Sequence, residues 1–134
     1  MKIVVDTNIL FSFFWQESLT RKLLITSNLE LISSEIALEE IEKYSQEIKR
    51  KLKITDKEFK EQFKKLKEVV KFINKKEYSQ FLKEAEFISP DKKDMEFFAL
   101  CIKNSCFLWS NDLILKSQDR IKVLSTKEII ELIF

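Results

Sequence analysis

The chain has 134 residues, of which 45% are hydrophobic and 34% charged, and its formal net charge at pH 7 is +2. This composition is typical of one folded domain, here expected over residues 1–134, and excludes a disordered chain. Because the chain has no His and no Gly, we exclude histidine catalysis, zinc held by histidine, glycine-rich phosphate loops and dinucleotide fingerprints.

Short apolar runs predict five β-strands. The first strand, at residues 2–6, is filled by Ile and Val and ends directly in Asp6. The other strands are predicted at residues 29–32, 68–73, 106–109 and 121–124. Helical patterns separate these runs, so the sequence predicts an α/β fold with three layers, α/β/α, around a central, mostly parallel five-stranded sheet.

Helices are predicted between the strands, and several have capping signals at their first residue. Ser34 can cap one helix, and Thr55 with Glu58 forms a capping-box pattern, as does Ser125 with Glu128. The predicted helices cover residues 8–14, 16–27, 34–48, a segment from residue 55, and residues 77–84, 89–104, 111–117 and 125–134. The alternation of strands and helices continues to the last residue.

Two aspartates are predicted to meet at one edge of the sheet. Asp6 ends the first strand and Asp112 follows the fourth. If these strands are neighbours in a doubly wound sheet, both carboxylates lie at the switch point, where such sheets bind their ligands. Clustered carboxylates repel one another, so a divalent cation is the usual reason to assemble them.

Two more acids lie on helices that are expected to begin near the same edge. Asp94 lies in the first turns of the helix predicted to start at Ser89, one turn before the apolar Phe98. Glu40 lies beside the apolar stripe of the helix capped by Ser34, a stripe formed by Ala37, Ile41, Tyr44 and Ile48. Both acids can therefore lean toward Asp6 and Asp112.

In order and spacing, these motifs resemble those of PIN domains, the metal-dependent nucleases that include VapC-type toxins. The resemblance rests on VDTNIL at 5–10, LEEI at 38–41, and the series Asp94, Ala99, Ser110, Asn111 and Asp112. It covers nearly the whole chain, although residues 49–86 match only in outline. The resemblance implies a PIN-like fold and hydrolysis of single-stranded RNA.

Carried onto this chain, the resemblance implies four catalytic acids: Asp6, Glu40, Asp94 and Asp112. Hard oxygen ligands without histidine or thiolate favour Mg²⁺ or Mn²⁺ over zinc. We expect Asp6, Asp94 and Asp112 to hold the metal. Supporting roles in the loop or in substrate binding are expected for Thr7, Asn8 and Ser110.

Two of these acids have competitors nearby in the sequence. Glu39 and Glu42 flank Glu40, and either could take its place. Asp91 competes with Asp94; its simpler interpretation is an acid in the first helical turn that interacts with the helix dipole.

Charge is spread unevenly along the chain. Residues 43–76 contain thirteen Lys and Arg against five Asp and Glu, a local net charge of +8, and the remainder has a net charge of −6. A basic segment beside an acid cluster suits a polyanion such as RNA, held by its phosphates; a solvated helix surface is the simpler interpretation. Three aromatic residues, Phe13, Phe14 and Trp15, closely follow the VDTNIL motif. We expect them to pack in the core or face a partner rather than stack on bases.

The two cysteines, Cys101 and Cys106, are too few for a four-cysteine zinc site and are predicted to be buried reduced thiols. The turn between them, Asn104-Ser105, stands where the resembled family commonly has glycine. Asn tolerates the left-handed backbone conformation, so this departure is expected to be harmless.

Other function classes fit the residues less well. A phosphatase that forms an aspartyl phosphate needs a second acid where the chain has Asn8, and a phosphoacceptor domain needs an early pair of acids and has no use for Glu40. A catalytically silent PIN-like module that binds RNA or protein stays open, as does a housekeeping role in RNA processing.

The expected partners follow from the toxin-like resemblance. A toxin would have a cognate antitoxin and would form a homodimer. No apolar run approaches the roughly 18 residues of a membrane span, and the N-terminus lacks the pattern of a signal peptide. We therefore predict a cytoplasmic protein with no membrane partner.

Overall fold

One five-stranded sheet forms the centre of the molecule in the computed structural model, which describes residues 1–15 and 17–134. Its strands are β1 (Lys2–Val5), β2 (Glu30–Ser34), β3 (Lys71–Ile73), β4 (Phe107–Trp109) and β5 (Val123–Leu124). They lie in the order β3-β2-β1-β4-β5, and every neighbouring pair is parallel. The α/β prediction is confirmed, and the sheet is entirely parallel.

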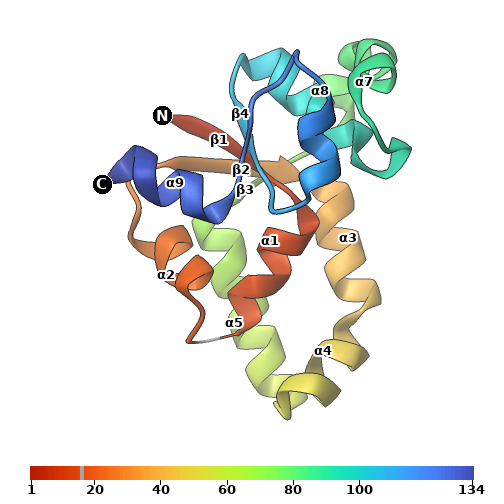
Figure 1. Ribbon diagram of the computed structural model, residues 1–134. Coiled ribbons are helices and arrows are strands. Elements are labelled where there is room, and N and C mark those ends of the chain that lie inside the picture. The colour runs from red at the N-terminus through yellow and green to blue at the C-terminus, as the bar shows by residue number, and fades with distance from the viewer. Residues whose placement is uncertain (16) are drawn as a thin grey trace.

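Helices flank this sheet on both sides. The α-helices are α1 (Thr7–Phe11), α2 (Leu19–Thr26), α3 (Glu35–Lys43), α4 (Ser45–Leu52), α5 (Asp56–Val69), α6 (Lys75–Tyr78), α7 (Leu82–Ile88), α8 (Met95–Asn104) and α9 (Thr126–Ile133). Figure 1 shows α7 and α8 above the sheet and α1, α2 and α5 below it. Among the described residues, no helix is both long enough and apolar enough to cross a membrane.

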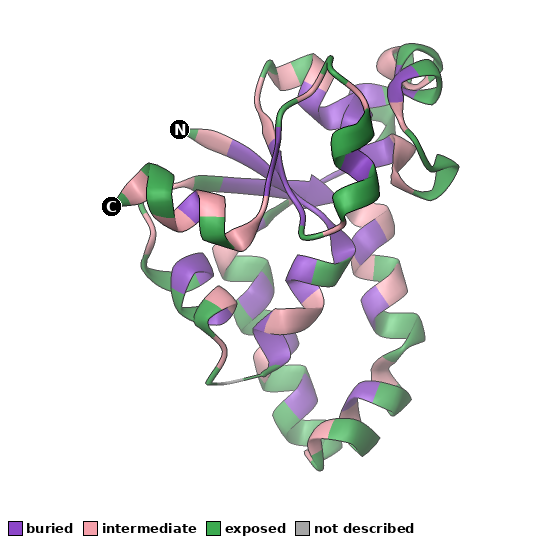
Figure 2. Cartoon of the chain, in the orientation of Figure 1, coloured by how far each residue is buried: buried purple, intermediate pink, exposed green. Residues whose placement is uncertain are grey.

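The central strand β1 brings the predicted strand ends together. Ile3, Val4 and Val5 are fully buried, and Figure 2 shows β1 and most of β2 as buried. Val5 lies in register with Trp109 of β4, and the backbone N–H of Asp6 donates to the carbonyl oxygen of Trp109 at 3.2 Å. Since β1 lies between β2 and β4, the chain reverses its direction of winding here, and the predicted switch point is confirmed.

Local capping signals set several helix starts correctly. Ser34 accepts a hydrogen bond from the backbone N–H of Ile36 at the start of α3. Both predicted capping boxes, at Thr55 and at Ser125, are formed at the starts of α5 and α9. Each cap satisfies backbone groups that would lack a partner at a helix end, so the sequence signal and the structure agree.

The single helix predicted over residues 34–48 is wrong, because the chain breaks at Tyr44. Its backbone (φ −96°, ψ 13°) separates α3 from α4. The Tyr44 side chain is 42% exposed instead of lying in the apolar stripe. It packs edge-on against Phe11, with 6.2 Å between the ring centroids. The turn therefore moves Tyr44 from the core to the surface beside α1.

The helix predicted from Ser89 also begins later than expected. A short 3-10 helix, Lys92–Asp94, comes first, and the Asp91 carboxylate caps it by accepting from the Lys93 backbone N–H at 3.0 Å. Asp94 then occupies the N-cap position of α8, which begins at Met95. Asp91 thus has the simple capping role, and Asp94 lies at the helix entrance rather than within its first turns.

Other helix and strand boundaries differ by a few residues from the predicted ones. Helix α5 continues to Val69, so β3 is shorter than the strand predicted over 68–73. The helix predicted over 77–84 is replaced by α6, a 3-10 turn at Ser79–Phe81, and α7. Helix α2 begins at Leu19 instead of residue 16, which itself lies outside the described residues.

Candidate active site

Asp6 is the buried acid at the centre of the candidate site. Only 3% of its surface is exposed, and its carboxylate caps α1 by accepting from the Ile9 backbone N–H at 3.0 Å. Burial raises the pKa of Asp6, hydrogen bonds from Ser110 and Ile9 oppose this increase, and the charge of Asp112 adds to it. A cation beside this carboxylate would stabilise its charged form.

Ser110 and Asp112 approach Asp6 from the end of β4. Ser110 is buried, with 1% of its surface exposed, and its hydroxyl accepts from the Asp112 backbone N–H at 3.1 Å. The Asp112 carboxylate caps the 3-10 helix Leu113–Ser117, accepting from the Ile114 N–H at 3.1 Å. The Ser110 hydroxyl also lowers the pKa of Asp6, so this one group interacts with the acids that follow both β1 and β4.

Asp94 carries the clearest electrostatic sign of clustered acids. Its pKa is raised from 3.8 to about 6, first by burial and then by the negative charges of Asp6, Asp91, Asp112 and Glu40. Such an increase is expected where carboxylates share a site without a compensating cation.

These acids line one cleft of about 330 Å³. Its lining residues are Asp6, Thr7, Asn8, Glu40, Asp91, Lys93, Asp94, Phe97 and Asp112. The structure therefore brings all four candidate acids together, although their roles stay predictions. Of the three neighbouring glutamates on α3, Glu40 lines the cleft, whereas Glu39 and Glu42 are exposed and are absent from its lining.

Lys93 was not anticipated from the sequence, although it places a cation in this acidic cleft. The available signal was its position directly before Asp94. An ammonium there can contact a phosphate oxygen of a substrate.

The donor set fits a hard divalent cation by its chemistry. It consists of carboxylate oxygens, the ligands that Mg²⁺ and Mn²⁺ prefer. Burial and then the repulsion between acids raise the pKa of Asp94, and a cation would relieve that repulsion. Within residues 1–15 and 17–134, however, no three acidic or thiol side chains are positioned closely enough to hold a metal ion as they stand. Binding would therefore require these side chains to turn further inward.

A family model described as PIN domain matches residues 4–129. The chain belongs to the PIN-domain family. This is a family of nucleases, and the expectation drawn from the sequence motifs is confirmed at that level. No curated protein matches this PIN domain significantly.

A solved structure similar to this PIN domain is VapBC2 from Rickettsia felis, bound to a DNA fragment from its promoter. The two chains share 16% sequence identity, with a TM-score of 0.64, and the match covers 93% of this chain and 98% of that one. At this identity the similarity concerns the fold, which is PIN-like over almost the full length of both chains.

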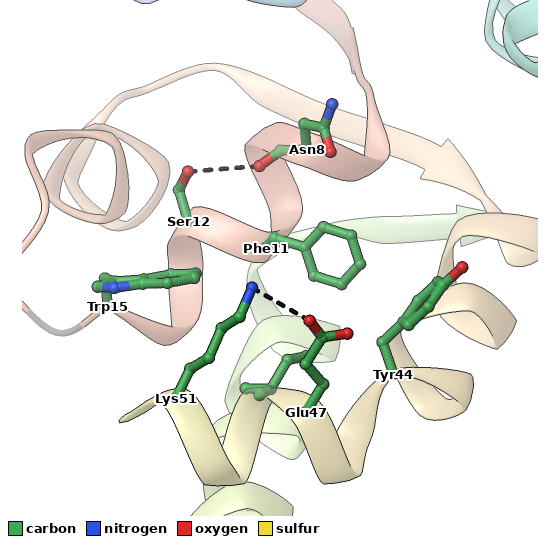
Figure 3. A pocket seen from close by; sticks show the side chains of 8 residues that line it. Asn8, Phe11, Ser12, Trp15, Tyr44, Glu47 and Lys51 are labelled. Atoms are coloured by element: carbon green, nitrogen blue, oxygen red, sulfur yellow. Dashed lines mark hydrogen bonds and ion pairs between the residues drawn. The ribbon is translucent and has the colours of Figure 1, made fainter. Parts of the chain in front are cut away.

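A second groove, of about 410 Å³, begins where the acid cleft of this PIN domain ends. Asn8 lines both hollows. The other lining residues of the groove are Phe11, Ser12, Trp15, Tyr44, Glu47, Ile48 and Lys51. Figure 3 shows Trp15 and Tyr44 on opposite sides of Phe11, with Lys51 paired to Glu47 at 3.1 Å. The groove thus combines aromatic rings with hydrogen-bonding groups.

The aromatic run at residues 13–15 divides between the core and this groove. Phe13 and Phe14 are buried as expected. Trp15 is 44% exposed and lines the groove. Of these three aromatic residues, only Trp15 is therefore accessible to a ligand in the groove.

The basic segment at 43–76 includes α4 and α5, which extend below α1 and α3 in Figure 1. None of its described residues lines the acid cleft. Lys51 of α4 lines the adjoining groove instead. We expected this segment to lie beside the acids. It instead borders the groove next to the acid cleft.

Proposed function

We propose that this PIN domain is an endoribonuclease that uses Mg²⁺ or Mn²⁺ to hydrolyse phosphodiester bonds of single-stranded RNA. One observation carries the proposal: four acids from separate parts of the chain line one cleft, where burial and the charges of the neighbouring acids raise the pKa of Asp94. The cost of assembling these charges is explained if the cleft binds a divalent cation together with a phosphate.

In this proposal Asp6, Asp94 and Asp112 hold the metal. When bound, the metal supplies a water of lowered pKa and stabilises the charge on the leaving oxygen. Glu40, on the α3 wall of the cleft, orients the attacking water by accepting a hydrogen bond from it. Lys93 neutralises a non-bridging phosphate oxygen.

The hydrogen bonds of Ser110 fit a positioning role. Its hydroxyl contacts both the Asp6 side chain and the Asp112 backbone, so it fixes the spacing of two ligands. Thr7 and Asn8 form the first turn of α1 beside Asp6, where they support the loop and border the substrate path.

RNA is proposed as the substrate because the groove next to the cleft suits a single strand. Exposed aromatic rings provide stacking surfaces for bases, and lysines track the phosphates. Trp15 and Tyr44 supply exposed rings, and Lys51 supplies a cation. A strand cut in the cleft would continue past Asn8 into this groove.

Replacing Trp15 with Ala is expected to weaken binding of single-stranded RNA by roughly 5- to 150-fold, because base stacking on an aromatic ring contributes about 1–3 kcal/mol. Fluorescence anisotropy with labelled RNA would measure this change, in a cleavage-deficient background. Phe87→Ala is the matched control, since Phe87 is 86% exposed and lies outside the groove. If the Trp15 variant and its parent bound RNA with equal affinity, the proposal that RNA binds in the groove would be wrong.

Metal dependence is tested by incubating the protein with a mixed RNA pool in Mn²⁺, Mg²⁺ or EDTA. We expect cleavage of single-stranded RNA with either metal, none in EDTA, and much slower cleavage of duplex RNA. Undiminished cleavage in EDTA would contradict the metal role. Absence of cleavage in every condition, by a folded protein, would favour the silent RNA-binding module.

We also propose a toxin role, with a cognate antitoxin as partner, a homodimer as the assembly and the cytoplasm as the location. The support is the similarity in fold to VapBC2, which is a complex bound to promoter DNA. Co-expression with a protein encoded beside this chain would test the proposal: the partner should copurify and suppress cleavage.

A further inference from the structure

The end of helix α8 has a specific geometry that places two cysteines together. Ser105 adopts a left-handed conformation (φ 49°, ψ 51°). The sequence had suggested Asn104 for this conformation. The Cys106 N–H donates to the Cys101 carbonyl oxygen at 3.2 Å, and the Ser105 N–H donates to that of Ile102 at 3.4 Å. This pair of bonds defines a Schellman motif.

A Schellman motif brings two particular side chains into contact. The residue after the left-handed one meets the residue five positions before it, and this contact is usually apolar. In this chain those positions are Cys106 and Cys101, and each thiol shifts the pKa of the other. Both cysteines are free, so the helix end holds a reduced dithiol in a six-residue loop.

The two thiols differ in access and acidity. Cys101 is fully buried, and burial raises its pKa. Cys106 is half-buried, and both border a surface pocket of about 380 Å³. The neighbouring Cys101 thiol, and to a smaller extent the charge of Lys2 and the backbone of Val4, lower the pKa of Cys106, although burial opposes them. An accessible thiol of lowered pKa beside a second thiol is the usual arrangement of a redox-sensitive cysteine.

We propose that Cys101 and Cys106 form a peroxide-sensitive modification site that closes to an intramolecular disulfide. The Cys106 thiolate attacks one oxygen of hydrogen peroxide, the O–O bond breaks, and a sulfenic acid and water form after protonation. The Cys101 sulfur then displaces the sulfenic hydroxyl, which leaves as water with the Cys101 proton. Two thiols lose two electrons, and one peroxide becomes two waters.

The site is independent of the proposed nuclease. The disulfide would join the end of α8 to the residue before β4, whereas Asp94 and Ser110 lie at the opposite ends of these two elements. Neither cysteine lines the acid cleft or the adjoining groove. Failure of the ribonuclease proposal would therefore leave this one unaffected.

The test is mass spectrometry of the folded protein after treatment with dilute hydrogen peroxide. We expect a mass lower by two hydrogen atoms, loss of both titratable thiols, and full recovery with a dithiol reductant. In Cys101→Ser, Cys106 should instead form a sulfenic acid that dimedone labels. In Cys106→Ser, the buried Cys101 should stay reduced.

Three outcomes would overturn the proposal. They are two intact thiols at a peroxide dose that oxidises free cysteine, oxygen added to cysteine without disulfide formation, and a disulfide that joins two molecules. The wild-type measurement decides between these outcomes and the proposal even if a serine variant fails to fold.

Discussion

Asp6→Asn is expected to lower metal-dependent RNA cleavage on the order of a thousandfold, because losing one ligand of a catalytic metal costs several kcal/mol of transition-state stabilisation. The fold should survive the change. Asn is a good N-cap and retains an oxygen that can accept from the Ile9 N–H. The substitution also removes a buried charge. Initial cleavage rates in Mn²⁺, with thermal melting as the test of folding, would measure both effects.

Asp91→Asn is the matched control for this substitution. Asp91 lines the same cleft and also caps a helical turn, through the Lys93 N–H. Asn can keep that cap, so we expect activity close to that of the wild type. If Asp91→Asn abolished cleavage and Asp94→Asn did not, the ligand role would belong to Asp91. If Asp6→Asn retained full activity, the proposed centre would be wrong.

Asp94→Asn is expected to stabilise the metal-free protein near neutral pH by about 1–2 kcal/mol. The shift from 3.8 to about 6 would correspond to roughly 3 kcal/mol, and partial exposure to solvent reduces this figure. The folded wild type binds the Asp94 proton more tightly than the unfolded chain, so the protonated carboxyl contributes stability to the wild type that is complete below the unfolded pKa. This wild-type contribution is lost as the pH rises through about 6, and the stabilisation by Asp94→Asn appears above that pH.

Urea unfolding in EDTA at about pH 5 and about pH 7.5 would measure the effect. Wild-type stability should decrease between these values more than that of Asp94→Asn. Equal pH dependence of the two proteins would show that Asp94 has an ordinary pKa. At neutral pH, millimolar Mn²⁺ should stabilise the wild type and have a much smaller effect on the variant, because the metal binds the folded state through this carboxylate.

Much of the sheet was predictable because its signals are local or depend on simple topology. The apolar run before Asp6 and the helices between strands predicted a parallel sheet. Parallel strands align their carboxyl ends, so Asp6 and Asp112 were expected at one edge once β1 and β4 were taken as neighbours. The pairing of Val5 with Trp109 confirms that arrangement.

The errors arose where tertiary packing or a local cap set a different backbone path from the one predicted. Tyr44 has the spacing of a core residue, yet the chain turns there, and its ring packs against Phe11 beside a groove. A helix was predicted to start at Ser89, yet Asp91 caps a 3-10 turn and α8 begins at Met95. In both places the sequence pattern allowed several backbone paths.

The sequence by itself determined the alternation of strands and helices, the caps at Ser34, Thr55 and Ser125, and the presence of acids at strand ends, because each depends on neighbours within a few residues. Tertiary structure alone decided that Glu40 rather than Glu39 or Glu42 lines the cleft. It also set the pKa of Asp94, because burial and charge–charge repulsion depend on distances between residues far apart in the chain.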